Sequence, residues 1–287
     1  MIGRTDSSGG GAKAGASPDL LGRLLALNRP VVMGILNITP DSFSDGGQYA
    51  DPAKAFDHAQ YMIAAGADII DIGAESTRPY VGAKPVSLEE ELARLAPILP
   101  AVVNLGVPVS IDTIKAGVAR WALDHGAAIL NDVWGLQRDP DMALLAAERG
   151  VPIVIMHNRN EADPAIDIVA DIRGFFARSL DIAAQAGIAP EAIVLDPGIG
   201  FGKTPEQSIQ AIARLREFEA FGLPILVGAS RKRFINTVVA TEPKQRLPGS
   251  LAAHLIAVEN GAAIVRAHDV AETVQALRVA AAIREAT

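Results

Sequence analysis

Chemically active side chains recur in this sequence at one kind of position, directly after a short apolar run. Most of the earlier ones are Asp or Asn, and the last ones are Arg, Lys and His. Carboxylates and amides there could accept hydrogen bonds from a donor-rich ring, and the cations could hold an anionic group such as a phosphate. In chain order these residues are Asn37, Asp71, Asp112, Asn131, Asp132, His157, Asp196, Ser230, Arg231, Lys232, Arg266 and His268.

Asp and Asn also favour strand ends for a structural reason, because they form Asx turns and cap the next helix. That explanation covers any one of them. It does not cover Arg, Lys and His at the same rim, or the run 231–233 at the start of a helix, where the macrodipole disfavours cations. An anionic ligand would remove this conflict. We therefore expect acceptors on one side of the rim, a basic arc on the other, and a ligand with a polar ring and a phosphate-like group.

Several other kinds of site are excluded by spacing. The stretch DPGIGFGKT (196–204) fits neither the Walker nor the dinucleotide-binding glycine pattern, so it predicts a tight turn that brings backbone close to a flat ligand. GASRK is not a nucleophile elbow, and no H-E-x-x-H zinc motif is present. Asn37 and Asp41 offer hard oxygen ligands, so a Mg²⁺ site beside the phosphate is plausible.

The elements that must position these residues alternate regularly from residue 30 onward. Apolar, β-branched runs alternate with Ala-, Leu- and Glu-rich segments, which we interpret as helices over 53–67, 88–106 (after an N-cap at Ser87) and 250–262 (with a Ser cap and a Gly stop). Continuous apolar strands separated by helices imply a parallel sheet covered on both faces, and eight such units predict a (β/α)8 TIM barrel. The predicted strands are 31–37, 67–73, 107–113, 127–133, 151–157, 192–198, 224–230 and 262–268.

Composition limits the remaining possibilities. The chain has 287 residues, a size that single α/β barrels commonly reach, and we expect a flexible extension over 1–19 and one barrel domain over 20–287. A net charge of −7 argues against a nucleic-acid partner. No apolar run approaches the roughly 18 residues of a membrane span. The absence of cysteine and of a secretory signal fits a cytoplasmic protein.

From about Val31 to the C-terminus, the sequence closely resembles the dihydropteroate synthases of the pterin-binding TIM-barrel superfamily. The motifs that carry the resemblance are MGILNITPDSFSDGG, DIGAESTRP, SIDT, ILNDV, LDPGIGFGK, VGASRK and IVRAHDV, in this order along the chain. The resemblance implies a transferase of folate biosynthesis that condenses a dihydropterin carrying a CH2-diphosphate with p-aminobenzoate. It also implies Mg²⁺ as cofactor, sulfonamides as inhibitors, these two small molecules as partners, and a homodimer.

The same resemblance implies roles for individual residues. The pterin would contact Asp112, Asn131, Asp196, Lys232, Met156, Phe201 and Gly228. The diphosphate would contact Asn37, Thr77, Arg78, Arg266 and His268, and the metal would contact Asn37 and Asp41. The p-aminobenzoate would contact Phe43, Thr77, Pro79, Phe201, Lys232 and Arg233. The catalytic residues would be Asn37, Arg78, Lys232, Arg266 and His268, with Phe43 in a lid that closes over the aminobenzoate ring.

Two alternatives share the predicted pterin pocket. One is a methyltransferase of the same superfamily that passes a folate methyl group to a corrinoid, which does not need the basic motifs. The other is a pterin-binding paralogue without activity. Three loops also depart from the family pattern, at YVGAKPVS, at Arg233 and at NRNEADPAID, and these departures concern the aminobenzoate pocket and sulfonamide sensitivity.

Overall fold

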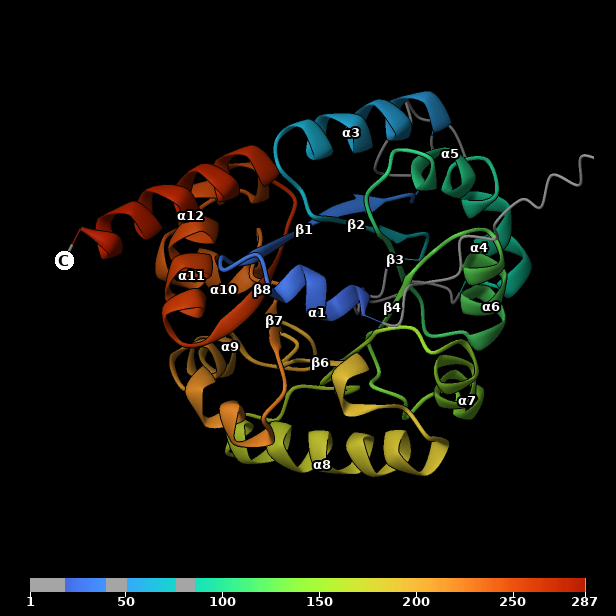
Figure 1. Cartoon of the computed structure of the whole chain (residues 1–287). Coiled ribbons are helices and arrows are strands. Elements are labelled where there is room, and N and C mark those ends of the chain that lie inside the picture. Colours follow the sequence, from blue (N-terminus) through green and yellow to red (C-terminus); the bar gives the residue numbers. More distant parts are fainter. Residues whose placement is uncertain (1–18, 40–50, 76–85, 287) are drawn as a thin grey trace, which may run out of the picture.

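A computed structural model describes residues 19–39, 51–75 and 86–286 of the chain. Eight parallel strands form a closed barrel in which every strand pairs with its neighbours in chain order and β8 closes on β1 (Figure 1). The prediction of a (β/α)8 barrel is therefore confirmed. The strands are β1 (Val31–Asn37), β2 (Ile69–Gly73), β3 (Val109–Asp112), β4 (Ile129–Asp132), β5 (Ile153–Met156), β6 (Ile193–Asp196), β7 (Ile225–Val227) and β8 (Ala262–Ala267).

Helices surround the barrel and cover the outer face of its strands (Figure 1). Their first turns follow capping rules: the Ser87 hydroxyl accepts a hydrogen bond from the Glu90 N–H (3.2 Å), and Thr204 and Gln207 form a reciprocal capping box. The helices are α1 (Leu20–Leu25), α3 (Pro52–Ala64), α4 (Leu88–Leu95), α5 (Leu99–Val103), α6 (Ala116–Asp124), α7 (Pro140–Arg149), α8 (Ile168–Ala186), α9 (Pro205–Ala213), α10 (Arg233–Val238), α11 (Leu247–Glu259) and α12 (Val270–Glu285). Short 3-10 turns lie at η1 (Pro190–Ala192), η2 (Leu215–Phe221) and η3 (Pro243–Gln245).

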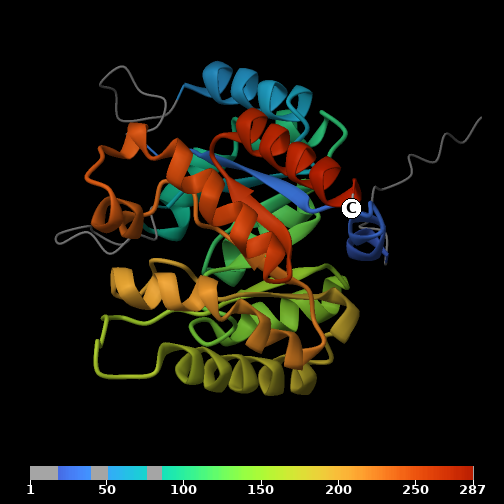
Figure 2. The ribbon, with the colours of Figure 1, turned by 90° about the vertical axis from the view of Figure 1, so that its left-hand side faces the viewer.

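The barrel interior is filled by side chains that alternate along each strand with the side chains facing the helices. One apolar cluster joins these inward positions to three leucines of α1, which lies across the barrel axis at the N-terminal ends of the strands (Figures 1 and 2). These leucines thereby cover the N-terminal end of the barrel, and the opposite mouth is where we look for a ligand site. The inward members of the cluster are Val31, Met33, Ile69, Ile129, Val154, Val194, Leu226 and Ile264.

Two predicted helices differ from the observed ones. The segment 88–106 forms two helices, α4 and α5, because Pro97 and Pro100 lack the N–H that a continuous helix needs. The last predicted helix begins at Leu247 rather than at Ser250, whose hydroxyl donates to the Arg246 carbonyl (2.8 Å) inside the first turn. Within the described ranges, no helix is both long and apolar enough to cross a membrane.

Candidate active site

The mouth of the barrel carries a layer of polar side chains directly above its apolar interior. Asp71, Asn131, Asp196 and Arg266 each follow an inward apolar residue by two positions, so alternation points them into the mouth. Asp112 shares this layer, because its partner in the sheet register is Asn131. The three carboxylates and the amide are buried. The structure thus brings together the predicted pterin residues of β3, β4 and β6 with Arg266 of β8.

Arg266 links the acidic residues of this layer. Its Nε donates to Asp71 Oδ2 (2.6 Å), its Nη2 donates to Asp112 Oδ2 (2.9 Å), and Asn131 Nδ2 donates to the same Asp71 oxygen (3.1 Å). The expected separation of acceptors from a basic arc is therefore wrong for Arg266, which lies among the carboxylates. Asp71 was noted at a strand end in the sequence, but no role was predicted for it. Its position two residues beyond Ile69 is the signal that could have placed it in the mouth.

Several acceptors in the mouth have no partner in the described part of the chain. They are Asp71 Oδ1, Asp112 Oδ1 and Ser110 Oγ, all of them buried. A buried acceptor without a donor costs about 1–3 kcal/mol, and more when it is charged. Burial raises the pKa of Asp112 to about 7, although the charge of Arg266 opposes the shift. A ligand that presents N–H groups to this layer would remove the cost.

Asp196 occupies the end of β6 beside Met156 of β5, its partner in the sheet register. Its Oδ1 accepts the Gly198 N–H (2.7 Å). Burial raises the pKa of Asp196 to about 6, while the Gly198 N–H and the charge of Lys232 oppose the shift. At Gly228, a side chain would begin 3.7 Å from Arg266 Cβ, so glycine leaves open space next to the guanidinium stem.

The loop between β6 and α9 forms one wall of the mouth. Gly198, Gly200 and Gly202 all have positive φ, and a Cβ on Gly198 would lie 1.9 Å from the His157 carbonyl oxygen. The predicted tight turn is confirmed, because only glycine fits this conformation and this close approach. The loop presents Phe201, whose ring centre lies 4.1 Å from Lys232 Nζ. Phe201, Lys232 and Asp196 therefore share one side of the mouth.

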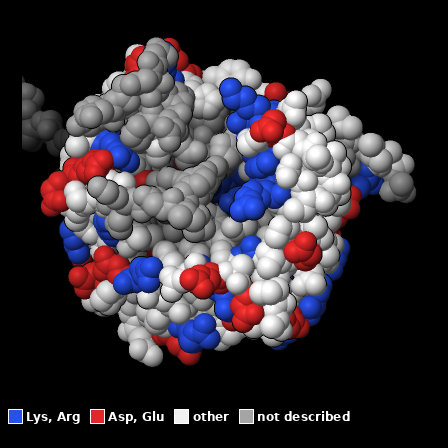
Figure 3. Space-filling model, turned by 180° about the vertical axis from the view of Figure 1, so that it is seen from behind, with Lys and Arg blue, Asp and Glu red and all other residues white. Residues whose placement is uncertain are grey.

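The basic residues after β7 and β8 are partly compensated by the protein itself. The Arg231 guanidinium bonds Asp269, with Nε 3.0 Å from Oδ2, so the argument that this run requires an anionic ligand is wrong for Arg231. His268 Nδ1 lies 3.0 Å from Ser230 Oγ. Arg233 is the exposed first residue of α10. Figure 3 shows Lys and Arg side chains gathered beside a hollow on this face of the molecule.

Two residues predicted for the rim serve the scaffold instead. His157 is completely buried, and its Nε2 lies 3.0 Å from Asp171 of α8. Asp132 accepts the N–H groups of Trp134 (2.9 Å) and Leu136 (2.7 Å), which is the Asx-turn role. Alternation explains both cases, because Asn131 and Met156 take the inward positions on their strands.

Five predicted site residues lie outside the described part of the chain: Asp41, Phe43, Thr77, Arg78 and Pro79. The residues that flank the second of these segments are described. Glu75 Oε1 accepts the Val86 N–H (3.1 Å), and Lys115 Nζ lies 2.8 Å from Glu91 Oε2 while also bonding Glu75. This buried ion-pair cluster ties residues 75 and 86 to α4, and no motif in the sequence indicated it.

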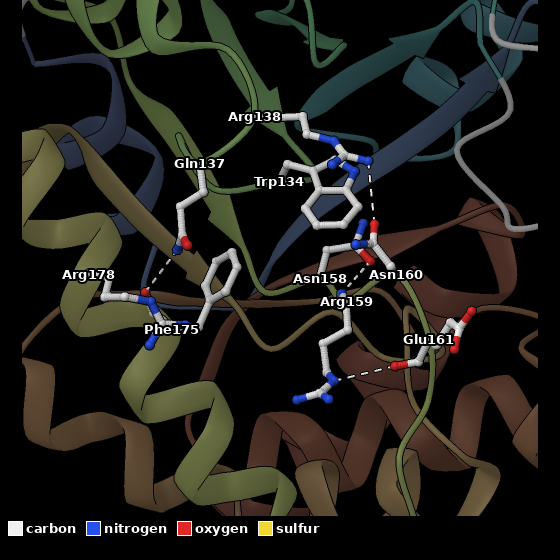
Figure 4. Close-up of a pocket in the computed structure, with 9 residues that line it drawn as sticks. All are labelled: Trp134, Gln137, Arg138, Asn158, Arg159, Asn160, Glu161, Phe175 and Arg178. Atoms are coloured by element: carbon white, nitrogen blue, oxygen red, sulfur yellow. Dashed lines mark hydrogen bonds between the residues drawn. The ribbon is translucent and has the colours of Figure 1, made fainter.

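A second cavity of about 620 Å³ lies outside the barrel, between the loops after β4 and β5 and helix α8 (Figure 4). Trp134 and Phe175 line it together with Arg138, Arg159 and Arg178. The Arg138 guanidinium stacks 4.1 Å from the Trp134 ring centre, and Arg159 Nη1 pairs with Asp171 at 2.9 Å. None of the predicted site residues lines this cavity.

Comparisons with known proteins agree with this geometry. Residues 33–268 match the family described as pterin binding enzyme. The chain is 48% identical to dihydropteroate synthase of Bacillus subtilis over 243 residues, which is 84% of each chain. Dihydropteroate synthase of Xanthomonas albilineans, solved with 4-aminobenzoic acid, superposes with a TM-score of 0.85 at 43% identity, over 90% of this chain and 94% of that one. The same enzyme in complex with 7,8-dihydropteroate gives a TM-score of 0.83 at 41% identity, over 93% and 98%.

Proposed function

The chain belongs to the dihydropteroate synthase family of pterin-binding enzymes, and from that premise we propose how its barrel mouth performs the reaction. The enzyme joins a dihydropterin that carries a CH2-diphosphate to p-aminobenzoate, and it releases pyrophosphate and 7,8-dihydropteroate. The observation that carries this function is the layer of buried acceptors that have no partner among the described residues, framed by Asp112, Asn131 and Asp196.

The pterin ring would bind in this layer. Its aminopyrimidinone edge offers adjacent N–H donors, and a carboxylate can accept two of them. Charge-assisted hydrogen bonds of this kind are worth about 1.5–3 kcal/mol each, which is enough to select the ring. Asp196 and Asp112 would be the acceptors, Asn131 would bind the ring edge, and Met156 and Gly228 would border it. Lys232 and Phe201 would lie at the junction between the pterin and the aminobenzoate.

The diphosphate would bind across the last strand and the first. Asn37 and His268 lie at the C-terminal ends of β1 and β8, which pair in the sheet. Arg266, two residues before His268, would supply a positive charge from the floor of the mouth. We include Thr77 and Arg78 because their motif, DIGAESTRP, resembles that of the family. These groups would stabilise the negative charge that grows on the leaving group as the C–O bond breaks.

A Mg²⁺ ion fits this end of the site. Asn37 offers a hard amide oxygen, and the described residues contain no cluster of three acidic or His ligands. Mg²⁺ commonly takes one or two protein ligands and completes its shell with substrate phosphates and water, which matches this donor set. Asn37, together with Asp41, would hold the ion, whose role when bound is to neutralise charge on the diphosphate.

We propose a dissociative displacement in which no side chain attacks the substrate. The bond between the CH2 carbon and the diphosphate oxygen breaks, and the oxygen keeps the electron pair. The p-aminobenzoate nitrogen then forms the C–N bond and loses a proton. Phe43, Pro79 and Arg233 would complete the aminobenzoate site, where sulfonamides would compete. A pterinyl group found covalently attached to any side chain would contradict this mechanism.

We also propose that the chain forms a homodimer through α11 and α12, which lie side by side on one flank (Figures 1 and 2). The large apolar side chains of Ile256 (47%), Val279 (54%) and Ile283 (65%) are exposed there. Exposed large apolar side chains on neighbouring helices favour an interaction site. A cytoplasmic location is the remaining part of the proposal, in keeping with a chain that has no cysteine.

The function is tested by incubating the purified protein with the dihydropterin diphosphate, p-aminobenzoate and Mg²⁺, and measuring both products. We expect dihydropteroate and pyrophosphate to form together. Pterin binding without either product would indicate an inactive paralogue. Methyl transfer from a folate to a corrinoid, without dihydropteroate formation, would indicate the methyltransferase alternative.

A further inference from the structure

A buried lysine lies behind the Phe201 wall of the active site and outside every predicted role. Lys203 Nζ donates to the Gly198 carbonyl (2.8 Å) and the Phe201 carbonyl (3.1 Å), and it lies 2.6 Å from His157 Nδ1. An ammonium group has three N–H donors, and here it meets three acceptors. Placing a lysine in a protein interior is costly, so this arrangement calls for an explanation.

The contact with Lys203 fixes the state of His157. Burial lowers the pKa of Lys203 to about 7, and below that pH its ammonium carries only donors. His157 Nδ1 then acts as the acceptor and the ring proton lies on Nε2. Nε2 then donates to Asp171 (3.0 Å), which also pairs with Arg159 (2.9 Å). A chain of alternating donors and acceptors therefore runs from the catalytic loop through the histidine to α8, and Arg159 ends it at the second cavity (Figure 4).

Lys203 holds the loop at the two carbonyls that determine the position of Phe201. The Phe201 N–H donates to the Gly198 carbonyl (3.0 Å), the same oxygen that accepts from Lys203. The Gly198 N–H in turn donates to Asp196 Oδ1 (2.7 Å). Lys203 is thus hydrogen-bonded directly to the backbone of Phe201, and it is connected through Gly198 to the Asp196 carboxylate. Both are groups to which the proposed function assigns substrate contacts.

We propose that Lys203, held by His157, is a positioning residue for both substrates, because it fixes the Phe201 ring and the Asp196 carboxylate in their binding positions. This inference rests on the proposed function. The alternative is that Lys203 only stabilises the fold. The two roles differ in a measurable way, because loss of folded protein lowers the apparent kcat and leaves KM unchanged, whereas displaced substrate contacts raise KM.

The first test is the substitution Lys203→Met, which keeps an unbranched side chain one atom shorter and removes the three donors. We expect KM for the dihydropterin diphosphate and for p-aminobenzoate to rise roughly tenfold, since misplacement of positioning groups by about 1 Å is costly. kcat per folded molecule should change by less than about threefold. Arg120→Met is the matched control, because Arg120 pairs with exposed Glu148 outside the barrel, and both KM values should be unchanged.

Two substitutions of His157 separate its partners. His157→Asn keeps an acceptor near the Nδ1 position and loses the bond to Asp171, whereas His157→Gln can reach Asp171 and loses the acceptor for Lys203. We expect both KM values for His157→Asn to stay within about twofold of wild type, and those for His157→Gln to rise as in Lys203→Met. Equal KM changes in the two variants would overturn the proposal, and so would wild-type KM values in Lys203→Met.

A spectroscopic readout tests the contact without any reaction. The chain has five histidines, so the ring ¹⁵N signals of His157 can be assigned by its absence in His157→Asn. Burial and the neighbouring Lys203 lower the pKa of His157 to about 3, against the charge of Asp171. The wild-type ring should stay neutral with its proton on Nε2 down to acid pH, and its pKa should rise in Lys203→Met. A protonated His157 at pH 6 in the wild type would contradict the assignment.

The two readouts also separate this inference from the proposed function. If the wild-type enzyme forms no dihydropteroate, the proposed function fails, and with it the stated role of Lys203. The ¹⁵N spectrum would still report whether the Lys203 contact exists. If the wild type is active and only the KM prediction fails, the inference alone is wrong. The charged groups that act on the pKa of Lys203 are Asp196, Asp171, Lys232 and Arg159, and all four are retained in every variant.

Discussion

Replacing Asp196 with Asn removes a buried negative charge from the barrel mouth and keeps the shape of the side chain. The Asn oxygen can still accept the Gly198 N–H that Asp196 Oδ1 accepts at 2.7 Å. Its amide NH2 would then face the N–H donors of the pterin, where the carboxylate offers an acceptor. The substitution should therefore weaken pterin binding without disturbing the loop.

The structure gives a magnitude for two effects of Asp196→Asn, a gain in the stability of the apo protein and a loss of pterin affinity. The pKa of Asp196 is raised from 3.8 to about 6, so at pH 8 the ionised side chain costs the folded protein about 3 kcal/mol. Asp196→Asn should therefore be more stable than the wild type at pH 8, by up to about 3 kcal/mol. Loss of two charge-assisted hydrogen bonds should cost pterin binding about 3–6 kcal/mol, or roughly 10²- to 10⁴-fold in Kd.

The size of the stability effect depends on pH. A carboxyl whose pKa is raised in the folded protein stabilises the fold fully below its unfolded pKa, which is near 4. This contribution to the free energy of unfolding is lost as the pH rises through about 6. Urea unfolding of the apo proteins at pH 4 and pH 8 should show equal stability at pH 4 and a more stable variant at pH 8. Titration calorimetry with the dihydropterin diphosphate gives the Kd. Wild-type affinity in Asp196→Asn, or a clearly less stable variant at pH 8, would refute the reasoning.

Four further predictions concern the remaining parts of the account. Asn37→Ala should slow turnover at least roughly tenfold and leave pterin affinity largely intact, because its role is at the departing diphosphate; steady-state kinetics and calorimetry test this. Phe43→Ala should raise KM for p-aminobenzoate much more than KM for the pterin substrate. Pterin binding near pH 6 should release protons, because the ligand favours the ionised forms of Asp112 and Asp196. Their pKa values are raised to about 7 and about 6 in the free protein. Calorimetry in buffers of different ionisation enthalpy measures this release. Ile283→Asp should shift the protein from dimer to monomer in sedimentation velocity, and a persistent dimer would contradict the proposed interface.

Much of the fold could be predicted because a parallel barrel imposes a simple pattern. Each strand is buried on both faces, so all eight appear in the sequence as apolar runs, and the bounds of β1 were predicted at both ends. Other strands were predicted too long. Ala127, for example, is buried but lies outside the bounds of β4, so burial alone does not define a strand. The break between α4 and α5 could have been predicted from Pro97 and Pro100.

The sequence predicts which strand-end side chains enter the mouth, through alternation, but it does not predict which of them pair. Alternation along each strand distinguishes inward Asn131 from outward Asp132, and a stricter use of it would have excluded His157. The bond between Arg266 and Asp71 joins residues 195 apart in the chain, and no local pattern predicts it. Lys203 resembled part of a phosphate loop in sequence, and only the packing of the loop against His157 shows that it is turned inward.

The central claim is that the barrel mouth couples departure of the diphosphate to attack by p-aminobenzoate. Its most direct test is the amount of pyrophosphate and of dihydropteroate formed by the wild-type protein from both substrates with Mg²⁺, followed over the same time course. We predict one pyrophosphate for each dihydropteroate, and formation of both products at least roughly fifty-fold slower in Asp196→Asn at wild-type KM concentrations. Absence of dihydropteroate in the wild type, or its formation without pyrophosphate, would contradict the account.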